Sequence, residues 1–285
     1  MSSTRPRASV VIPAHDEAAV IGETLRVLLT DPGELEVVVV CNGCQDGTAQ
    51  LARDAGARVV EIATASKIAA LNAGDQAATV FPRIYLDADV GIDLASLRAV
   101  IDALAAGAAA AAPRPVLDTT GCGPGSRMFF RFRSHLGYLR HHTLGAGVYG
   151  LSEQGRARFG RFPEVIADDG FVYALFAPAE RVNPAGATFT IRVPRTLRST
   201  YHRQVRIALG NLQLARAGHL LDTPPPTWRQ VVRADPRLSV AALVFVAVQG
   251  AARLRARRLL RTGAAPAWSR DETTRVAPLA AGVGR

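Results

Sequence analysis

The first hundred residues alternate short apolar runs with helical patterns, and this alternation constrains the fold more than any other feature. The runs rich in Val, Ile and Leu are at 8–13, 35–41, 57–62 and 83–86, and the helical patterns that follow them are at 17–29, 48–55, 67–80 and 94–106. Strands of this length that alternate with helices form a mostly parallel sheet flanked by helices. We therefore expect an α/β fold whose ligands lie beyond the carboxyl ends of the strands.

Past residue 113 the alternation ends and the charge changes sign. Residues 1–112 carry 8 basic and 14 acidic side chains, whereas residues 113–285 carry 26 basic and 10 acidic ones. The two halves are therefore expected to contact different partners. A strand at 187–193 and a helix at 200–214 are expected next. Pro224 to Pro226 indicate a linker, because three prolines cannot continue a helix, and a helical extension and a loose tail follow.

The helical extension contains an apolar run of fifteen residues, Leu238 to Ala252, which is followed by arginines up to Arg261. The run is shorter than the roughly eighteen residues that indicate a membrane span. Two interpretations of 238–261 stay open, a helix lying on an anionic membrane surface and a helix packed in the core. The opening residues do not predict a signal peptide, and 3 cysteines, an odd number, are typical of a reducing compartment. We expect a cytoplasmic protein, peripheral on the inner membrane face if the helix is interfacial.

Two pairs of carboxylates stand out as candidate chemistry. Asp87 and Asp89 directly follow the fourth apolar run, and at this spacing both can turn toward one hard cation and its phosphate ligands. A turn or a helix cap is the alternative for this pair. Asp168 and Asp169 have apolar residues on both sides, which favours partial burial and a raised pKa, as a general base needs. A helix N-cap is the alternative here.

Three basic residues are candidates for binding phosphate. Lys67, the one lysine among 34 basic residues, follows the third apolar run, with Ser66 as the expected cap of the next helix. A helix N-terminus binds phosphate oxygens well, and an ammonium adds a point charge there. Arg203 and Arg206 are spaced to share one helix face, which suits a diphosphate. Solvated surface positions are the alternative for all three.

Segments in order along the chain resemble the motifs of family 2 glycosyltransferases of the GT-A fold. They are Val10 to Glu17, similar to the opening strand and "NE" turn; Cys41 to Thr48, similar to "DDGSxDGT"; Ser66 to Gly74, similar to "KxxALNxG"; Asp87 to Asp89, similar to the D-x-D; Asp168 and Asp169, similar to "ED"; and Arg203 to Arg206, similar to a reduced "QxxRW". The resemblance spans residues 8–215. It implies a GT-A domain over 1–223, with a mostly parallel sheet flanked by helices, and a C-terminal helical extension with a loose tail over 224–285.

The resemblance implies an inverting transfer of a sugar from a nucleotide-diphosphate sugar to a hydroxyl acceptor. Residues 8–112 would bind the nucleotide sugar and residues 113–223 the acceptor. Asp89, with Asp87 beside it, would hold Mn²⁺ or Mg²⁺, and Asp169 would be the base, with Asp168 its neighbour. The residues implied for the nucleotide-sugar site are Pro13, Ala14, His15, Glu17, Cys41, Asn42, Lys67, Asp87, Ala88, Arg203 and Arg206.

The chain departs from the family pattern at three places. Cys41 and Asn42 stand where an acid pair usually meets the base and ribose, so the resemblance does not assign the nucleobase. Asp168 stands in place of a glutamate, which leaves open whether Asp168 or Asp169 is the catalytic base. Ile207 stands in place of the tryptophan, which argues against a processive synthase. The basic half and the segment 238–261 suggest a lipid-linked acceptor, in cell-envelope or exopolysaccharide synthesis.

Two other functions remain open. A sugar-phosphate nucleotidyltransferase has a related sheet, but it would carry a glycine- and lysine/arginine-rich loop where this chain has Pro13 to Glu17. A non-catalytic nucleic-acid-binding protein would explain the net charge of +10, yet the acidic first half and an aromatic content of 6% argue against base stacking. We therefore expect a nucleotide-sugar donor and a hydroxyl acceptor as partners, and no nucleic acid.

Overall fold

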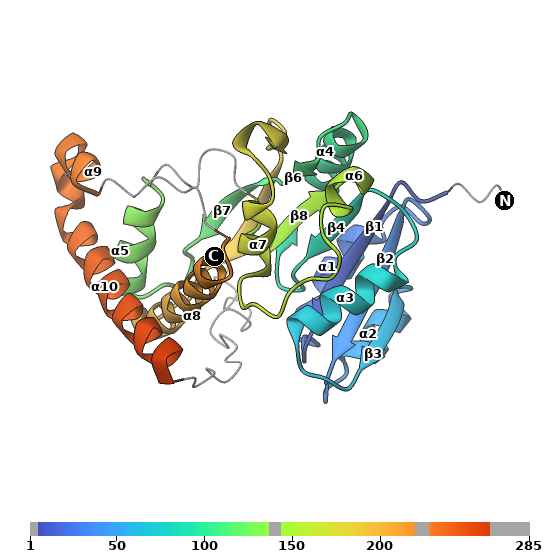
Figure 1. Ribbon diagram of the computed structural model, residues 1–285, viewed down its shortest axis with the longest axis horizontal. Coiled ribbons are helices and arrows are strands. Elements are labelled where there is room, and N and C mark those ends of the chain that lie inside the picture. The colour runs from blue at the N-terminus through green and yellow to red at the C-terminus, as the bar shows by residue number, and fades with distance from the viewer. Residues whose placement is uncertain (1–4, 137–143, 220–227, 263–285) are drawn as a thin grey trace, which may run out of the picture. The chain divides into compact units, whose positions relative to one another are not determined.

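The computed structural model describes residues 5–136, 144–219 and 228–262 of an α/β protein (Figure 1). The main sheet contains β1 (Ala8–Ala14), β2 (Leu35–Asn42), β3 (Arg58–Ile62), β4 (Arg83–Leu86), β6 (Ala110–Ala111), β8 (Val148–Leu151) and β9 (Arg181–Val182). A smaller sheet contains β5 (Gly91–Ile92), β7 (Arg114–Asp118) and β10 (Thr188–Arg192). The helices that accompany the main sheet are α1 (Ile21–Leu28), α2 (Thr48–Asp54), α3 (Lys67–Ala77), α4 (Leu94–Ala105), α6 (Glu153–Arg156) and α7 (Asp168–Ala174).

The strand order of the main sheet is β3-β2-β1-β4-β8-β6-β9. β1 pairs in parallel with both β2 and β4, and β2 pairs in parallel with β3, which confirms the predicted parallel sheet over the first four runs. β8 is antiparallel to β4, with Val148 opposite Leu86. Because β8 runs in the opposite direction, it begins at the same edge of the sheet where β1 and β4 end. The residues that precede β8 therefore meet the predicted site.

Burial explains why the first strands are continuous apolar runs. Every residue of β1 is buried, as expected for a parallel strand that is covered on both faces. α3 packs on β1 and β2 through small residues: a Cβ at Gly74 would lie 2.4 Å from Val11 Cγ1, and Ala70 is fully buried. The close approach of α3 holds its first residue, Lys67, at the carboxyl edge of the sheet.

The expected helix over 17–29 begins later than predicted. The backbone N–H groups of Val20 and Ile21 both donate to the carbonyl of Glu17, so a turn precedes α1. Asp16 adopts a φ of 49°, a left-handed conformation that a helix cannot contain. The polar residues after β1 therefore form a loop at the sheet edge, and the helix starts at Ile21.

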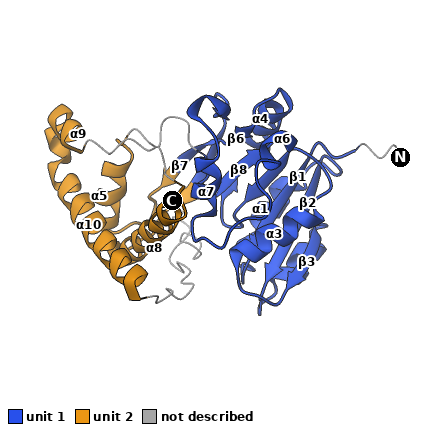
Figure 2. Cartoon of the chain, viewed as in Figure 1, with its two compact units in different colours: residues 1–116, 142–190 blue, residues 117–141, 191–285 orange. Residues whose placement is uncertain are grey.

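The chain forms two compact units (Figure 2). Unit 1 comprises 1–116 and 142–190, and unit 2 comprises 117–141 and 191–285. The helices of unit 2 are α5 (Pro124–Arg133), α8 (Leu197–Arg216), α9 (Trp228–Ala234) and α10 (Ser239–Thr262). The predicted boundaries at 112 and 223 concern binding roles and stay predictions. Residue 223, the expected linker at Pro224 to Pro226 and the expected tail lie outside the described residues.

Unit 2 has an apolar core of its own. The rings of Phe129 and Phe132 on α5 lie 5.0 Å and 5.2 Å from the ring of Phe245 on α10, measured between centroids. Leu238 and Val193 are buried in the same cluster. The segment over α5 therefore folds with the C-terminal helices, which no local sequence pattern indicates.

α10 is longer than the apolar run from which it was predicted. The helical stretch Pro236–Thr262 is long and apolar enough to cross a membrane by length and composition, so the length of the apolar run alone does not decide against a span. One face of α10 is buried in unit 2, through residues such as Phe245 and Ala252. Its other face is exposed and includes Leu243 and Leu254. Both open interpretations thus keep support, and contact with a membrane stays a prediction.

Candidate functional site

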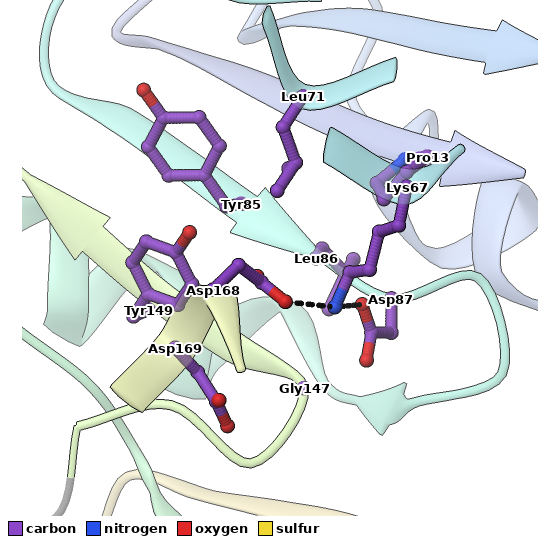
Figure 3. Close-up of a pocket in the computed structure, with 10 residues that line it drawn as sticks. All are labelled: Pro13, Lys67, Leu71, Tyr85, Leu86, Asp87, Gly147, Tyr149, Asp168 and Asp169. Carbon is purple, nitrogen blue, oxygen red and sulfur yellow. Dashed lines mark ion pairs between the residues drawn. The ribbon is translucent and has the colours of Figure 1, made fainter. Parts of the chain in front are cut away.

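A pocket lies in unit 1 at the edge of the sheet where β1 and β4 end and β8 begins (Figure 3). Its empty space is about 210 Å³, open solvent included. The residues that line it are Pro13, Lys67, Leu71, Tyr85, Leu86, Asp87, Gly147, Tyr149, Asp168 and Asp169. The structure thus brings five of the residues predicted for the site into one pocket.

Lys67 links the two predicted carboxylate pairs. Ser66 caps α3, as predicted, because its Oγ accepts a hydrogen bond from Ala69 N at 3.2 Å. Lys67 Nζ lies 2.8 Å from Asp87 Oδ1 and 3.1 Å from Asp168 Oδ1. Burial alone would lower the pKa of Lys67, but the carboxylates of Asp168 and Asp87 raise it above its usual value. Lys67 is therefore a fixed positive charge between the two pairs.

The turn after β4 presents Asp87 and Asp89 differently. Asp87 N donates to the carbonyl of Gly147 at 2.8 Å, which joins the end of β4 to the turn before β8. Ala88 is buried, and its carbonyl accepts a hydrogen bond from Thr24 Oγ1 at 2.9 Å. Asp87 is half-buried and Asp89 is exposed. The pair therefore offers carboxylate oxygens on the solvent side of an anchored turn.

Asp168 and Asp169 occupy the first turn of α7, and neither is its N-cap. Ala167 holds the cap position, so the N-cap interpretation of the pair is wrong. Asp168 is 3% exposed, and burial raises its pKa to about 6, with help from Asp169 and against the effect of Lys67. Asp169 is less buried, and its Oδ2 accepts a hydrogen bond from Ala146 N at 2.9 Å. One carboxylate is thus held by Lys67 and the other by the turn before β8.

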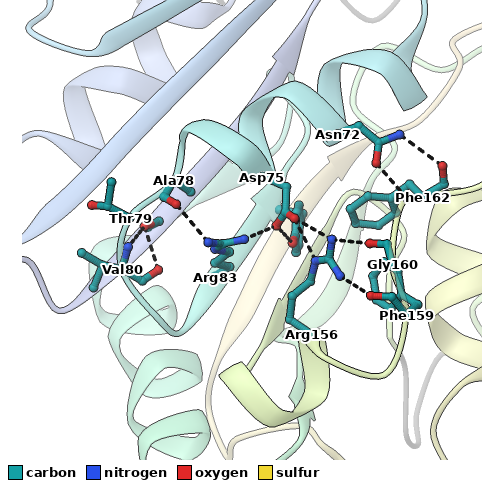
Figure 4. A network of polar contacts seen from close by, with 12 residues as sticks. Asn72, Asp75, Ala78, Thr79, Val80, Arg83, Arg156, Phe159, Gly160 and Phe162 are labelled. Carbon is teal, nitrogen blue, oxygen red and sulfur yellow. Dashed lines mark hydrogen bonds and ion pairs between the residues drawn. The ribbon is translucent and has the colours of Figure 1, made fainter.

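A buried network connects α3 to the loop that leads into α7 (Figure 4). Asp75 on α3 accepts hydrogen bonds from Arg83 and Tyr85, each at 2.6 Å, and from Arg156 Nη2 at 2.6 Å. Arg156 also donates to the carbonyls of Phe159 and Gly160 at 2.6 and 2.7 Å. Because both oxygens of Asp75 accept hydrogen bonds from cationic or phenolic donors, the carboxylate can stay buried in this network, although Arg83 Nε has no partner among the described residues.

Asn72 extends this connection one turn nearer to Lys67. Its Nδ2 donates to the carbonyl of Phe162 at 3.1 Å, and its Oδ1 accepts from Phe162 N at 2.8 Å. The ring of Phe159 packs edge-on against Phe171 of α7, with centroids 5.3 Å apart. α3 therefore positions α7 both directly, through Lys67, and through the loop that precedes it.

The residues predicted at the ends of β1 and β2 also lie together. His15 Nδ1 lies 2.6 Å from the carbonyl of Asn42, and Asn42 Nδ2 donates to the carbonyl of Ala14 at 2.8 Å. Glu17 is buried, and its N–H donates to Thr48 Oγ1 at 2.7 Å. Burial raises the pKa of Cys41 to about 12, so its thiol is neutral. These hydrogen bonds hold the residues after β1 against the end of β2 and the start of α2.

One group of three close side chains in the described part of the chain has the residue types of a metal site. Asp16, Cys44 and Asp46 have ligand atoms within 4.8 Å of one another. The carboxylates already accept backbone hydrogen bonds: Asp16 from Gln45 N at 2.6 Å, and Asp46 from Thr48 N at 3.0 Å. These bonds close the loop after β2, and we assign the group that structural role.

Of the predicted site residues that do not line the pocket, two are in unit 2, and several site residues were not predicted. Arg203 and Arg206 are on α8 in unit 2, and their contact with a diphosphate stays a prediction. Asn72, Asp75, Tyr85, Tyr149 and Arg156 were missed. A polar residue in an apolar segment, such as Asp75 on α3 or Tyr149 on β8, is the weak signal that could have identified some of them.

Comparisons with known proteins agree on one class. The family model described as Glycosyl transferase family 2 matches residues 9–153, which is more than half of the chain. No curated protein matches the chain. A solved mannosyltransferase from Pyrobaculum calidifontis, in complex with GDP-Man and Mn²⁺, is 24% identical with a TM-score of 0.59, and the match covers 92% of this chain and 80% of that one.

Two further solved structures share the fold. TarS residues 1–349 from S. aureus, with UDP-GlcNAc, are 15% identical with a TM-score of 0.50, and the match covers 90% of this chain and 92% of that one. Glucosyl-3-phosphoglycerate synthase from Mycobacterium tuberculosis, with Mn²⁺, UDP-Glc and phosphoglyceric acid, is 20% identical with a TM-score of 0.50, and the match covers 77% and 82%. At these identities the structures establish the GT-A fold. The family match carries the assignment: the chain belongs to glycosyl transferase family 2 and is a glycosyltransferase.

Proposed function

We propose that the protein transfers a sugar, with inversion at the anomeric carbon, from a nucleotide-diphosphate sugar to a hydroxyl acceptor. The observation that carries this proposal is the position of Lys67 between Asp87 and Asp168. A cation at the end of α3 suits the diphosphate, and the carboxylates on its two sides suit a metal-binding role and an acceptor-binding role. Both kinds of group are needed in one pocket for direct transfer.

The donor side fits a divalent cation. Asp89 is exposed and Asp87 is half-buried on the same turn, and carboxylate oxygens are the ligands that Mn²⁺ and Mg²⁺ prefer. A Cβ at Gly147 would lie 2.7 Å from Val90 Cγ2 and 3.5 Å from Asp87 Oδ2, so a glycine is needed where the turn before β8 passes the turn that carries Asp87. A bound divalent ion would neutralise charge that develops on the departing diphosphate. Asp89 and Asp87 would hold the ion, and Lys67 would bind a phosphate oxygen.

The acceptor side supplies the base. We assign the base to Asp169, because Asp168 is already engaged by Lys67 and is almost fully buried. Asp169 would accept the proton of the acceptor hydroxyl as its oxygen attacks the anomeric carbon, while the bond from that carbon to the diphosphate breaks. Asp168 would hold Lys67 in place. Arg203 and Arg206 would add positive charge for the diphosphate.

The acceptor is proposed to be lipid-linked, in cell-envelope or exopolysaccharide synthesis, and the protein to be cytoplasmic and peripheral on the inner membrane face. The support is α10, whose exposed face carries Leu243 and Leu254, followed by Arg257, Arg258 and Arg261. Apolar side chains beside arginines suit the interface of an anionic membrane. α10 contains no acidic residue that would oppose this contact.

The function is tested by thermal unfolding with a panel of nucleotide sugars and Mn²⁺ or Mg²⁺, followed by a transfer assay with the sugar that stabilises most. We expect stabilisation that needs both metal and nucleotide sugar, and Asp89→Ala should abolish it while the unliganded protein keeps its melting temperature. Metal-dependent binding that survives in Asp89→Ala would contradict the metal assignment. Consumption of a sugar 1-phosphate and a nucleoside triphosphate would instead favour the nucleotidyltransferase alternative.

The diphosphate contacts have a separate test. Lys67→Ala, and the double change of Arg203 and Arg206 to Ala, should weaken binding of a nucleoside diphosphate more than binding of the monophosphate. The reason is that the second phosphate loses its cation. Equal losses for the diphosphate, the monophosphate and the free nucleoside would indicate a fold defect or a base contact.

A further inference from the structure

Two tyrosines face each other across the strands that carry the pocket, and their hydroxyls have opposite environments. Tyr85 on β4 is directly opposite Tyr149 on β8, and the rings stack with centroids 5.0 Å apart. The hydroxyl of Tyr85 donates to Asp75 at 2.6 Å. The hydroxyl of Tyr149 is buried and has no hydrogen-bond partner among the residues that the structure describes.

An unpartnered buried hydroxyl is costly. Leaving such a group without a hydrogen bond costs about 1–3 kcal/mol, and a phenylalanine would fill the same space in the stack without that cost. Tyr149 is 3% exposed, so bulk water does not satisfy it. A molecule bound in the pocket or an enclosed water is therefore the candidate for the missing partner.

The pocket shows what kind of molecule this is. Tyr149 lines the pocket together with Lys67, Asp168 and Asp169, and its hydroxyl end lies on the side toward Tyr85 (Figure 3). Burial, reinforced by the charge of Asp168, raises the pKa of Tyr149 well above its usual value, so the hydroxyl keeps its proton. A protonated phenol can both donate and accept a hydrogen bond, as a sugar hydroxyl can.

We propose that the hydroxyl of Tyr149 binds a hydroxyl group of the transferred sugar and so helps to select that sugar. This inference rests on the proposed function, in which Lys67 binds the diphosphate and Asp169 meets the acceptor. The sugar lies between those two groups during transfer, and Tyr149 lines the same pocket. A site built to bind a substrate hydroxyl discriminates strongly against an analogue that lacks it, because the protein group is then left unpaired.

The chain offers a matched control, since Tyr85→Phe and Tyr149→Phe each remove one hydroxyl from the same stacked pair. The probes are GDP-mannose, UDP-glucose and UDP-GlcNAc with Mn²⁺, compared with GDP and UDP. For the nucleotide sugar that stabilises the wild type, Tyr149→Phe should raise the dissociation constant about tenfold, which is about one hydrogen bond, and leave that of the nucleoside diphosphate unchanged. Its melting temperature should stay equal or rise. Tyr85→Phe should lower the melting temperature, because Asp75 loses a donor, and this opposite effect on stability distinguishes a hydroxyl with a structural partner from the unpartnered hydroxyl of Tyr149.

Deoxy analogues of the same nucleotide sugar identify the hydroxyl. The wild type should bind one deoxy analogue about tenfold more weakly than the parent sugar, and Tyr149→Phe should bind the two equally. An unchanged ratio of constants in Tyr149→Phe would overturn the inference in favour of an enclosed water. A shift of the pH profile of transfer without a change in sugar binding would overturn it in favour of a bond to Asp168. A wild type that binds no nucleotide sugar would overturn the proposed function and this inference with it.

Discussion

Gly145 lies directly against Asp169. A Cβ at Gly145 would be 2.5 Å from Asp169 Cβ, closer than two such atoms can approach, and the φ of Gly145 is +99°, a conformation that favours glycine. The next residue, Ala146, donates its N–H to Asp169 Oδ2. The turn before β8 and the proposed base therefore fix each other's position.

Gly145→Ala should impair catalysis through this contact. The added methyl group displaces Asp169, so we expect transfer to fall by about two orders of magnitude, as for loss of a general base, with nucleotide-sugar binding retained. The control is Gly186→Ala, because Gly186 also has a positive φ of +77° but nothing within 4 Å of its Cβ position. The control should share the loss of stability and keep its turnover number. Equal turnover in the two variants would show that the contact with Asp169 does not matter.

Replacement of the two acidic residues by their amides separates their roles. Asp169→Asn should keep donor binding near normal while transfer falls by about two or more orders of magnitude, because the acceptor hydroxyl keeps its proton. Asp168→Asn should affect donor binding as well, since Lys67 loses one of its two carboxylate partners. Single-turnover assays alongside binding measurements decide the question. Normal turnover in Asp169→Asn together with an inactive Asp168→Asn would identify Asp168 as the catalytic base instead.

Asp168 should make stability depend on pH in the metal-free protein. Its pKa is raised from 3.8, the value expected for the unfolded chain, to about 6. Between these values the folded protein holds a proton that the unfolded chain has released, so the stabilising effect is complete below about pH 4 and is lost as pH rises through about 6. In urea unfolding, the free energy of unfolding of the wild type should therefore fall relative to that of Asp168→Asn as pH rises from about 4 to about 6. Parallel curves for the two proteins would contradict the raised pKa.

Arg156 should act on catalysis through the position of the loop. Arg156→Lys keeps a charge for Asp75 but cannot reach the carbonyls of Phe159 and Gly160 as well, so we expect kcat to fall more than donor affinity. Arg158→Lys is the control: Arg158 is in the same loop, but its side chain is 35% exposed, against 11% for Arg156, and it pairs with Glu180. Steady-state kinetics on both variants test this. A loss of donor affinity with unchanged kcat would place the effect at the donor site instead.

The exposed face of α10 should bind anionic vesicles. Flotation should capture the full chain at low salt and release it at high salt, because the arginines contribute through screened charges. Leu243→Gln should weaken capture about tenfold, since Leu243 is 71% exposed and free to insert. Leu51→Gln, on α2 in unit 1 and 42% exposed, should have no effect. If both substitutions weaken capture equally, α10 is not the contact surface.

The first four strands could be predicted because their signal is local. Each is a run of apolar residues set off by polar ones, and the observed bounds of β1 and β4 agree with the runs to within one residue. The start of α1 could not be predicted in the same way, because a left-handed Asp16 interrupts a helical pattern without changing it. The pairing of β8 with β4 depends on residues far apart in the sequence, which carry no shared local pattern.

In the candidate site too, the residues with a local sequence signal could be predicted and the long-range contacts could not. Lys67, Asp87, Asp168 and Asp169 could be named from motifs, yet the ion pairs from Lys67 to carboxylates of both pairs come from the fold alone. Tyr149 belongs to none of the motifs, and only the folded structure shows that its hydroxyl is buried without a hydrogen-bond partner among the described residues. The roles of all these residues stay predictions until the variants are measured.

Lys67 has one more consequence, which concerns chemical labelling. It is the only lysine in the sequence, so apart from the terminal amine the chain has one primary amine, and that amine lies in the pocket. Reductive methylation with ¹³C-formaldehyde would therefore give a single side-chain NMR resonance. The ammonium forms ion pairs with Asp87 and Asp168. Its chemical shift would therefore change if either carboxylate left Lys67 to bind another group, such as a metal ion. The composition of this chain thus provides a spectroscopic reporter at the site without any mutation.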